Sequence, residues 1–190
     1  MEVKTFDIPG LALVIPRAFD DDRGYFFESW NDATYASLGL FDPTERFVQD
    51  NESGSKRGVV RGLHFQRPPF AQAKLVRVVR GRVMDVAVDI RVGSPTFGRY
   101  QVVLLSGENR HQFFVPVGFA HGFISLEEGT IFAYKVTAPY AKECDGGIRF
   151  DDSTLDIPWP THDQLIVSEK DRLLPTLSEY LEQPAFRYGE

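Results

Sequence analysis

Short apolar segments separated by glycine and proline fill the middle of the chain, from about Val59 to Thr137, and this pattern constrains the fold most strongly. The segments are rich in Val, Ile and Phe, have the length of β-strands, and alternate with turn sequences such as RVGSPTFG and LSGENR. Their nearly regular spacing favours a β-sandwich or β-barrel over βαβ units. The expected strands are Val59–Phe65, Lys74–Val79, Arg82–Ile90, Gln101–Leu105, Gln112–Val117, Gly122–Leu126 and Thr130–Val136.

The segment VMDVAVDI places both of its carboxylates on one face of a strand. Alternation puts Met84 and the even-numbered residues after it on one face, and Val83, Asp85, Ala87 and Asp89 on the other. The simplest interpretation is that Asp85 and Asp89 face water. The alternative is a barrel whose interior is polar because it holds a ligand.

Helical signals are few. Ala33–Leu38 follows Asn31 and Asp32 as candidate caps, and Leu177–Glu182 is a second candidate near the C-terminus. There is no internal repeat and no low-complexity linker, and 190 residues suit one domain. We therefore expect a single domain over residues 1–190, with a short N-terminal strand region and a C-terminal extension of mixed character.

Charge and cysteine content exclude several classes of function. The chain has 21 Lys+Arg against 27 Asp+Glu, a net charge of −6, which opposes general nucleic-acid binding. The single cysteine, Cys144, excludes an internal disulfide and a cysteine-based zinc site. The start, MEVKTFDIPGLALVIP, lacks the basic and then apolar pattern of a secretory signal, and no apolar run is long enough to span a membrane. The expectation is a soluble cytoplasmic protein that does not bind membranes.

The common cofactor and hydrolase motifs are missing from the sequence. It contains no dinucleotide-binding or P-loop glycine pattern, no G-x-S-x-G and no H-E-x-x-H. The histidines are His64, His111, His121 and His162, and no two are close enough in sequence to form a local metal site. His162 is assigned no role.

His64 and His121 stand out because glycine and aromatic residues enclose each of them, in RGLHFQ and PVGFAHGF. A histidine among apolar neighbours is more often a core residue than a catalyst. PVGFAHGF nevertheless fits the P-x-G-x-x-H element of the cupin barrels. Metal-binding cupins also carry an earlier H-x-H followed by Glu, whereas RGLHFQ has one histidine. We therefore expect a cupin without a metal.

Eight segments in order resemble the dTDP-4-dehydrorhamnose 3,5-epimerase family: FDDDRGYFFES, FVQDN, RGLHFQ, AKLVRVVRG, DVAVDIRVGSPTFG, PVGFAHGF, AYKVT and SEKD. They run from near residue 19 to residue 171. The resemblance implies a mostly β, cupin-type double-stranded β-helix with a few short helices. It also implies a cofactor-free enzyme of dTDP-L-rhamnose biosynthesis, acting on a dTDP-4-keto-6-deoxyhexose. The family further implies a homodimer that exchanges an N-terminal strand between its subunits.

The resemblance assigns four catalytic residues. The general base falls on His64, paired with the carboxylate of Asp171, and the acid that returns a proton to the opposite face falls on Tyr134. Lys74 falls on the lysine near the enolate oxygen. The set is chemically sensible, because a carboxylate favours the imidazolium form of its histidine and a fixed cation stabilises an enolate.

Substrate contacts carry over in the same way. Arg23 and Arg61 match arginines suited to a diphosphate. Tyr140 matches an aromatic residue that stacks on the thymine. Asp145 aligns where the family more often has Glu, so the shorter side chain leaves that contact open. Further matching positions are Glu28, Gln49, Asp50, Asn51, His121 and Lys170.

Structural interpretations compete with these assignments. Arg23 could cap a turn opposite Asp20–Asp22, Tyr134 could be a core residue, and Lys74 and Arg61 could be solvated. Strict alternation also places Arg61 and His64 on opposite faces, so a shared pocket requires a bulge near Gly62.

Two other functions remain open at this point. One is an epimerase that inverts a single centre, for another deoxysugar. The other is a non-catalytic cupin that binds a nucleotide sugar. The joint presence of His64, Asp171, Tyr134 and Lys74 favours an enzyme, because binding alone needs no acid–base set on separate segments.

Overall fold

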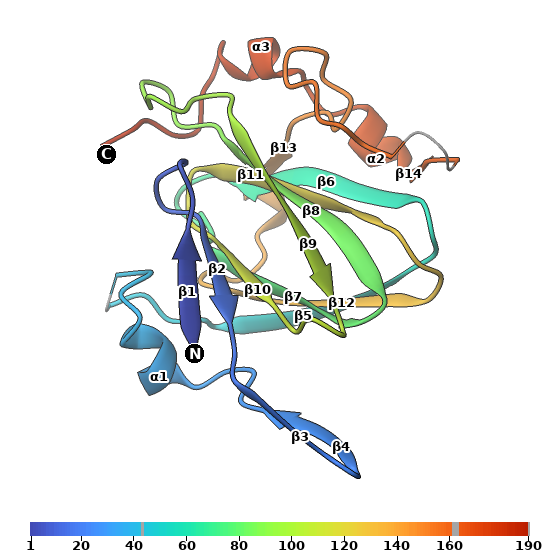
Figure 1. The fold of residues 1–190 in the computed structure, drawn as a ribbon. Helices are drawn as coiled ribbons and strands as arrows, with labels where there is room; N and C mark the ends of the chain where they lie inside the picture. The colour runs from blue at the N-terminus through green and yellow to red at the C-terminus, as the bar shows by residue number, and fades with distance from the viewer. Residues whose placement is uncertain (43, 161–163, 190) are drawn as a thin grey trace.

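Two β-sheets packed face to face form the body of the molecule in this computed structural model, which describes residues 1–42, 44–160 and 164–189 (Figure 1). The first sheet has the order β1-β2-β10-β7-β12-β5, and the second has the order β13-β6-β11-β8-β9, with β14 beside β6. All pairings are antiparallel except that of β14 with β6. The first sheet comprises β1 (Glu2–Thr5), β2 (Ala12–Ile15), β5 (Gln49–Ser55), β7 (Lys74–Arg80), β10 (Gln112–Val115) and β12 (Thr130–Val136). The second comprises β6 (Val59–Gln66), β8 (Arg82–Asp89), β9 (Tyr100–Ser106), β11 (Phe119–Ser125), β13 (Asp145–Gly147) and β14 (Ile166–Val167).

This architecture confirms the mostly β, cupin-type double-stranded β-helix. Each of the seven strands expected from the apolar pattern is present, with ends that differ by a few residues. Both expected helices are present as well, as α1 (Asp32–Ala36) and α3 (Leu177–Tyr180). Asn31 caps α1 by accepting a hydrogen bond from the Thr34 N–H at 3.1 Å.

The core between the sheets buries the odd-numbered face of β8. Val83 and Ala87 pack there against Val76 of β7 and Phe132 of β12. Asp85 shares this inward face and is 0% exposed. Asp89, at the end of β8, is 0% exposed too. The interpretation that these two carboxylates face water is therefore wrong, because alternation turns them inward together with Val83 and Ala87.

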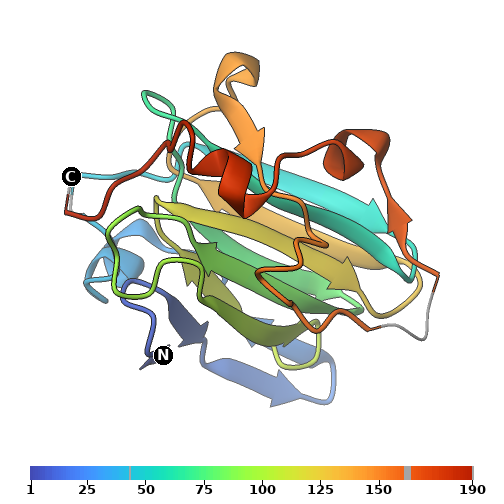
Figure 2. The same cartoon turned by 90° about the horizontal axis from the view of Figure 1, so that it is seen from above.

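The C-terminal extension covers the outer face of the second sheet (Figure 2). Leu177 and Tyr180 of α3 pack with Val86 and Val88, on the even-numbered face of β8. The Tyr180 hydroxyl donates to the carbonyl of Ile90 at 2.9 Å. The even-numbered face of β8 is apolar because α3 covers it, while the odd-numbered face is buried between the two sheets.

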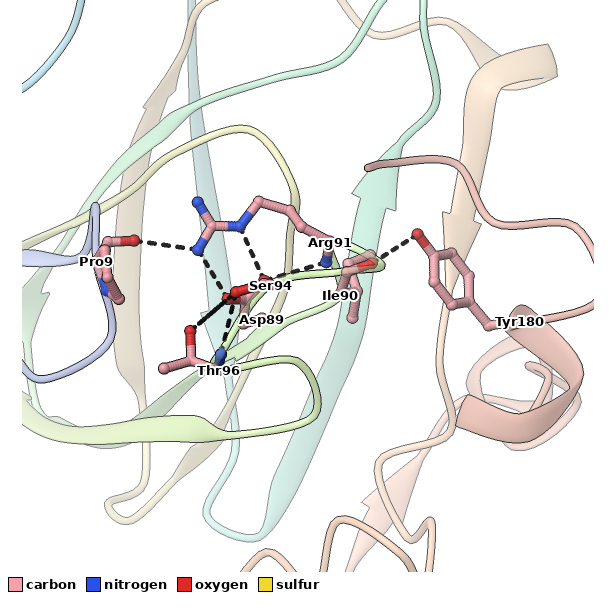
Figure 3. A network of polar contacts seen from close by, with 7 residues as sticks. All are labelled: Pro9, Asp89, Ile90, Arg91, Ser94, Thr96 and Tyr180. Carbon is pink, nitrogen blue, oxygen red and sulfur yellow. Dashed lines mark hydrogen bonds and ion pairs between the residues drawn. The ribbon is translucent and has the colours of Figure 1, made fainter. Parts of the chain in front are cut away.

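A polar network fixes the loop after β8, as Figure 3 shows. The carboxylate of Asp89 accepts hydrogen bonds from Arg91, from the Ser94 hydroxyl at 2.6 Å and from the Thr96 hydroxyl at 2.6 Å. Arg91 also donates to the carbonyl of Pro9 at 3.1 Å. Asp89 is thus a fully paired structural carboxylate. It orients Arg91, which holds the N-terminal loop against the body of the molecule.

The N-terminal hairpin of β3 (Ala18–Asp21) and β4 (Gly24–Phe27) projects away from both sheets (Figure 1). Its apolar side chains are largely uncovered: Phe26 is 71% exposed, and Phe19 and Tyr25 are exposed as well. An isolated two-stranded hairpin is at best marginally stable in water, and exposed aromatic residues mark interaction surfaces.

Two short helical turns complete the described chain, η1 (Lys142–Cys144) and α2 (Glu169–Arg172). Cys144 is buried and free. None of the described helices is long and apolar enough to cross a membrane.

Candidate active site

A cavity of about 620 Å³ lies between the two sheets and gathers most of the expected site residues. Its size is typical of a small-ligand site. Nine of the expected residues line it: Arg61, His64, Lys74, His121, Tyr134, Tyr140, Asp145, Lys170 and Asp171. They come from both sheets, from the loop after β12 and from α2.

His64 and Asp171 form a hydrogen-bonded pair in this cavity. His64 Nε2 lies 2.7 Å from Oδ1 of Asp171, although 107 residues separate the two in sequence. Ser168 caps α2 by accepting from the Asp171 N–H at 3.1 Å, which fixes the carboxylate at the end of the first turn. Burial opposes ionisation of Asp171, but hydrogen bonds from His64 and from the Gly62 N–H outweigh burial and hold its pKa below the usual value.

The ionised carboxylate of Asp171 decides which ring nitrogen of His64 is basic. A carboxylate can only accept hydrogen bonds, so Nε2 of His64 carries the proton that it donates to Asp171. Nδ1 is then the nitrogen with a free lone pair. Proton uptake at Nδ1 would form an imidazolium, which the negative charge of Asp171 stabilises.

A β-bulge at Gly62 lets Arg61 and His64 serve one cavity, as the sequence argument required. On β11, His121 pairs with His64 and Phe123 pairs with Arg61, so three steps along β6 match two along β11. Gly62 has φ +128°, and a Cβ there would lie 2.6 Å from the Gly122 Cα. Only glycine fits this position, because both the dihedral angle and the close approach exclude a side chain.

Lys74 is a buried cation in the cavity rather than a solvated one. Its Nζ donates to the carbonyl of His64 at 3.1 Å. Burial lowers its pKa to about 8, and the negative charges of Asp85 and Asp145 partly oppose this effect. A cation with so few polar partners is available to a developing negative charge.

Tyr134 lies on β12, in the sheet opposite to His64. Its side chain is partly buried and packs against the core between the sheets, yet it also lines the cavity. Burial raises the pKa of its hydroxyl, and the positive charge of Arg61 opposes part of that rise. The phenol therefore holds its proton at neutral pH and can donate it. Tyr134 therefore packs against the core and lines the cavity at the same time, so its interpretation as a core residue does not exclude a role in the site.

Tyr140, Asp145 and Lys170 form one edge of the cavity. The Tyr140 hydroxyl donates to Oδ2 of Asp145 at 3.2 Å, and Lys170 forms an ion pair with the same carboxylate. That hydrogen-bonded ion pair raises the pKa of Lys170. The side-chain oxygen of Gln49 accepts from the Tyr140 N–H at 3.0 Å. Tyr140 is 57% exposed, so one edge of the site offers an accessible aromatic ring beside a cation.

Other expected residues lie outside this cavity. Asp50 and Asn51 line a smaller cavity of about 250 Å³, where Asp50 forms an ion pair with Lys135 at 2.6 Å. Arg23 lies in the projecting hairpin, paired with Asp21 at 2.5 Å, as its interpretation as a turn cap anticipated. Glu28 follows the hairpin and accepts from the Asn31 side chain at 3.0 Å. His162 lies outside the described residues.

Asp85 was not among the expected site residues, although it contacts one of them. Its Oδ1 lies 2.8 Å from Nε2 of His121. The inward face of β8 was the signal that could have identified it, because His121 lies on β11, which pairs with β8.

The described residues contain no group of three or more His, Cys, Asp or Glu side chains that could hold a metal ion. The cavity brings together an imidazole, a phenol and a buried ammonium group, which are side chains that can transfer protons and stabilise a negative charge.

Comparison with known proteins gives consistent matches over nearly the whole chain. The model of the dTDP-4-dehydrorhamnose 3,5-epimerase family matches residues 5–179. A dTDP-4-dehydrorhamnose 3,5-epimerase of Methanothermobacter thermautotrophicus is 50% identical over 179 residues, covering 93% of this chain and 94% of that protein.

Solved structures agree in fold. A dTDP-6-deoxy-D-glucose-3,5-epimerase from Legionella pneumophila, in complex with dTDP-4-keto-L-rhamnose, is 44% identical with a TM-score of 0.94, covering 100% of this chain and 99% of that one. A 3'-monoepimerase from Streptomyces bikiniensis, in complex with dTDP-quinovose, is more distant at 29% identity and a TM-score of 0.88, covering 96% and 91%.

Proposed function

Because the chain belongs to the dTDP-4-dehydrorhamnose 3,5-epimerase family, we propose that its cavity inverts carbons 3 and 5 of dTDP-4-dehydro-6-deoxy-D-glucose. The product is dTDP-4-dehydro-L-rhamnose, an intermediate of dTDP-L-rhamnose biosynthesis. The enzyme is an isomerase, and the reaction needs no net oxidation or reduction.

Each inversion proceeds through an enolate. Carbons 3 and 5 flank the carbon 4 ketone, so each C–H bond can lose its proton while its electron pair moves toward the ketone oxygen. His64 Nδ1 takes the proton, and the carboxylate of Asp171 stabilises the resulting imidazolium. The Lys74 ammonium stabilises the enolate oxygen, which contributes on the order of 3 kcal/mol to lowering the barrier. Tyr134 then donates its proton to the opposite face of the carbon, and solvent restores both groups.

One observation supports this mechanism: the proposed base and the proposed acid lie on opposite sheets of one cavity. His64 belongs to β6 and Tyr134 to β12, and the cavity lies between them. Inversion requires a proton to leave one face of a carbon and another to arrive on the opposite face. A binding site alone would have no need for an imidazole bonded to a carboxylate opposite a phenol.

The nucleotide of the substrate is proposed to lie at the edge of the cavity. Tyr140 supplies an exposed ring on which the thymine can stack. Arg61 and Lys170 line the same cavity and provide positive charge for the diphosphate. Asp145 is engaged by both Tyr140 and Lys170, so even the shorter carboxylate reaches these two neighbours.

We further propose that the protein is a homodimer that exchanges the β3–β4 hairpin. The hairpin projects from the two sheets (Figure 1), and its Phe19, Tyr25 and Phe26 are each more than half exposed. Arg23, expected to contact the substrate, lies on this hairpin and not in its own cavity. If the hairpin packs on a second copy, Arg23 reaches the cavity of that copy. The expected exchange of an N-terminal strand would then account for the expected contact of Arg23 with the substrate.

The test is proton NMR of the keto sugar in deuterated water with the enzyme. We expect deuterium at carbons 3 and 5 and formation of the doubly inverted product. Exchange at only one carbon would support the single-centre alternative. Tight binding of the nucleotide sugar without any exchange would support the non-catalytic cupin.

A further inference from the structure

A second buried histidine–carboxylate pair lies beside His64 and Asp171. His121 is the register partner of His64, and its Nε2 lies 2.8 Å from Oδ1 of Asp85. Asp85 is 0% exposed, and its other oxygen, Oδ2, has no hydrogen-bond partner among the described residues. Burial of a half-paired carboxylate is costly unless a positive charge lies near it.

Lys74 provides that charge. The titratable and charged groups that line the cavity with Lys74 come from both sheets, the loop after β12 and α2: Arg61, His64, His121, Tyr134, Tyr140, Asp145, Lys170 and Asp171. Asp85 of β8 lies behind His121. Asp85 and Asp145 are the two carboxylates whose charges favour the ammonium form of Lys74. Asp145 is already paired with Lys170. No lysine or arginine in the described part of the chain forms an ion pair with Asp85.

We infer that Asp85 is a positioning residue of this site: its carboxylate fixes the ring of His121 and supplies the counter-charge of the Lys74 ammonium. The inference rests on the proposed function, in which Lys74 must be protonated to stabilise the enolate. The pKa of Lys74 is already lowered to about 8 by burial. Without the negative charge of Asp85 the pKa would fall further, and a large part of the lysine would be neutral at physiological pH.

The test uses Asp85→Asn, which removes the charge and keeps an oxygen that can accept from His121. Carbon-13 NMR of the lysine ε-carbons gives the titration midpoint of Lys74, assigned by its loss in Lys74→Arg. We expect the midpoint to fall by about one pH unit. The alkaline limb of the kcat profile should fall equally, so that kcat above this midpoint drops about tenfold. KM should change little, whereas Asp85→Ala, which also releases His121, should raise KM.

Asp89→Asn is the matched control. Asp89 lies on the same strand and is equally buried, but Arg91, Ser94 and Thr96 satisfy its carboxylate outside the cavity. This variant should lower thermal stability and leave the Lys74 midpoint unchanged.

An unchanged Lys74 midpoint in Asp85→Asn would overturn the inference. If the Lys74 midpoint falls in Asp85→Asn but the kcat profile does not shift, Asp85 is the counter-charge of Lys74 as inferred. The role given to Lys74 in the proposed function would then be wrong.

Discussion

Proton transfer at His64 depends on which ring nitrogen is free. The hydrogen bond with Asp171 occupies Nε2, which leaves Nδ1 as the nitrogen that can take up a proton. The lowered pKa of Asp171 keeps the carboxylate ionised well below neutral pH. The pair thus acts as one unit, in which Asp171 is required only because His64 must become positively charged.

This coupling predicts how variants of the pair combine. His64→Ala should lose about 10²–10⁴-fold in kcat, because it removes the general base. Asp171→Asn should lose less, since it keeps a hydrogen-bond partner but removes the charge. The double variant should be nearly as active as His64→Ala alone, because the second change has no base left to act on. Steady-state kinetics of the four proteins tests this. Losses that multiply would mean that the two residues act independently.

Single residues also show where sequence reasoning stops. Alternation along β8 correctly predicted that Asp85 and Asp89 share a face, but not that the face is buried. Burial depends on the packing of the two sheets. The partner of Asp85 is His121, 36 residues away in sequence, whereas Arg91, the partner of Asp89, is only two residues away.

At the scale of the element, the apolar strands in the middle of the chain were predicted, whereas the polar strand β5 was not. β5 has the sequence QDNESGS, which gives no apolar alternation, and it forms because β12 supplies a full antiparallel partner. α2 was missed although Ser168 and Asp171 stand at the spacing of an N-cap and its third residue. The bulge on β6 was required by the positions of Arg61 and His64 and is present.

The bulge gives a prediction for Gly62→Ala. A Cβ at this position would meet the Gly122 Cα at 2.6 Å and the His121 carbonyl at 2.9 Å, so the strands must separate. We expect a loss of about 1–3 kcal/mol in the free energy of unfolding and a larger relative loss of activity, because His64 moves. Gly24→Ala is the control, since its φ of +127° is similar but no atom lies within 4 Å of the added carbon. Equal melting temperatures for the two variants would contradict this account.

Exchange of the β3–β4 hairpin can be tested by subunit complementation. Arg23→Ala and His64→Ala should each be weakly active as purified proteins. After the two are unfolded together and refolded as a mixture, mixed dimers would contain one cavity with both Arg23 and His64 intact. We therefore expect activity well above that of either variant. If Arg23 served its own subunit, each cavity would keep one defect and mixing would restore nothing.

At the scale of the whole molecule, function depends on two sheets that place unlike groups on opposite walls. The C-terminal extension packs on the outer face of the second sheet, in part through Tyr180. The cavity lies on the inner face of the same sheet, between the two sheets. The sequence predicted the strands between Val59 and Val136, and nine of the expected site residues line one cavity. It could not give the distance between β6 and β12, which arises only when the two sheets pack.

Catalysis by such a cavity should not depend on a metal ion. RGLHFQ offers one histidine, and the described residues hold no cluster that could bind a metal. Dialysis against a strong chelator should therefore leave turnover unchanged. A large loss that one divalent metal restores would overturn the assignment of His64 as a free base.

The claim that acid and base work from opposite walls is tested most directly with Tyr134→Phe in deuterated water. The variant keeps the ring and its packing but has no hydroxyl, so substrate affinity should change little. His64 can still remove a proton and return a deuteron to the same face. NMR should therefore show deuterium entering at carbons 3 and 5 while formation of inverted product falls sharply, whereas the parent protein couples the two. Inversion of both centres by the variant at the parental rate would contradict the account and leave Tyr134 as a core residue.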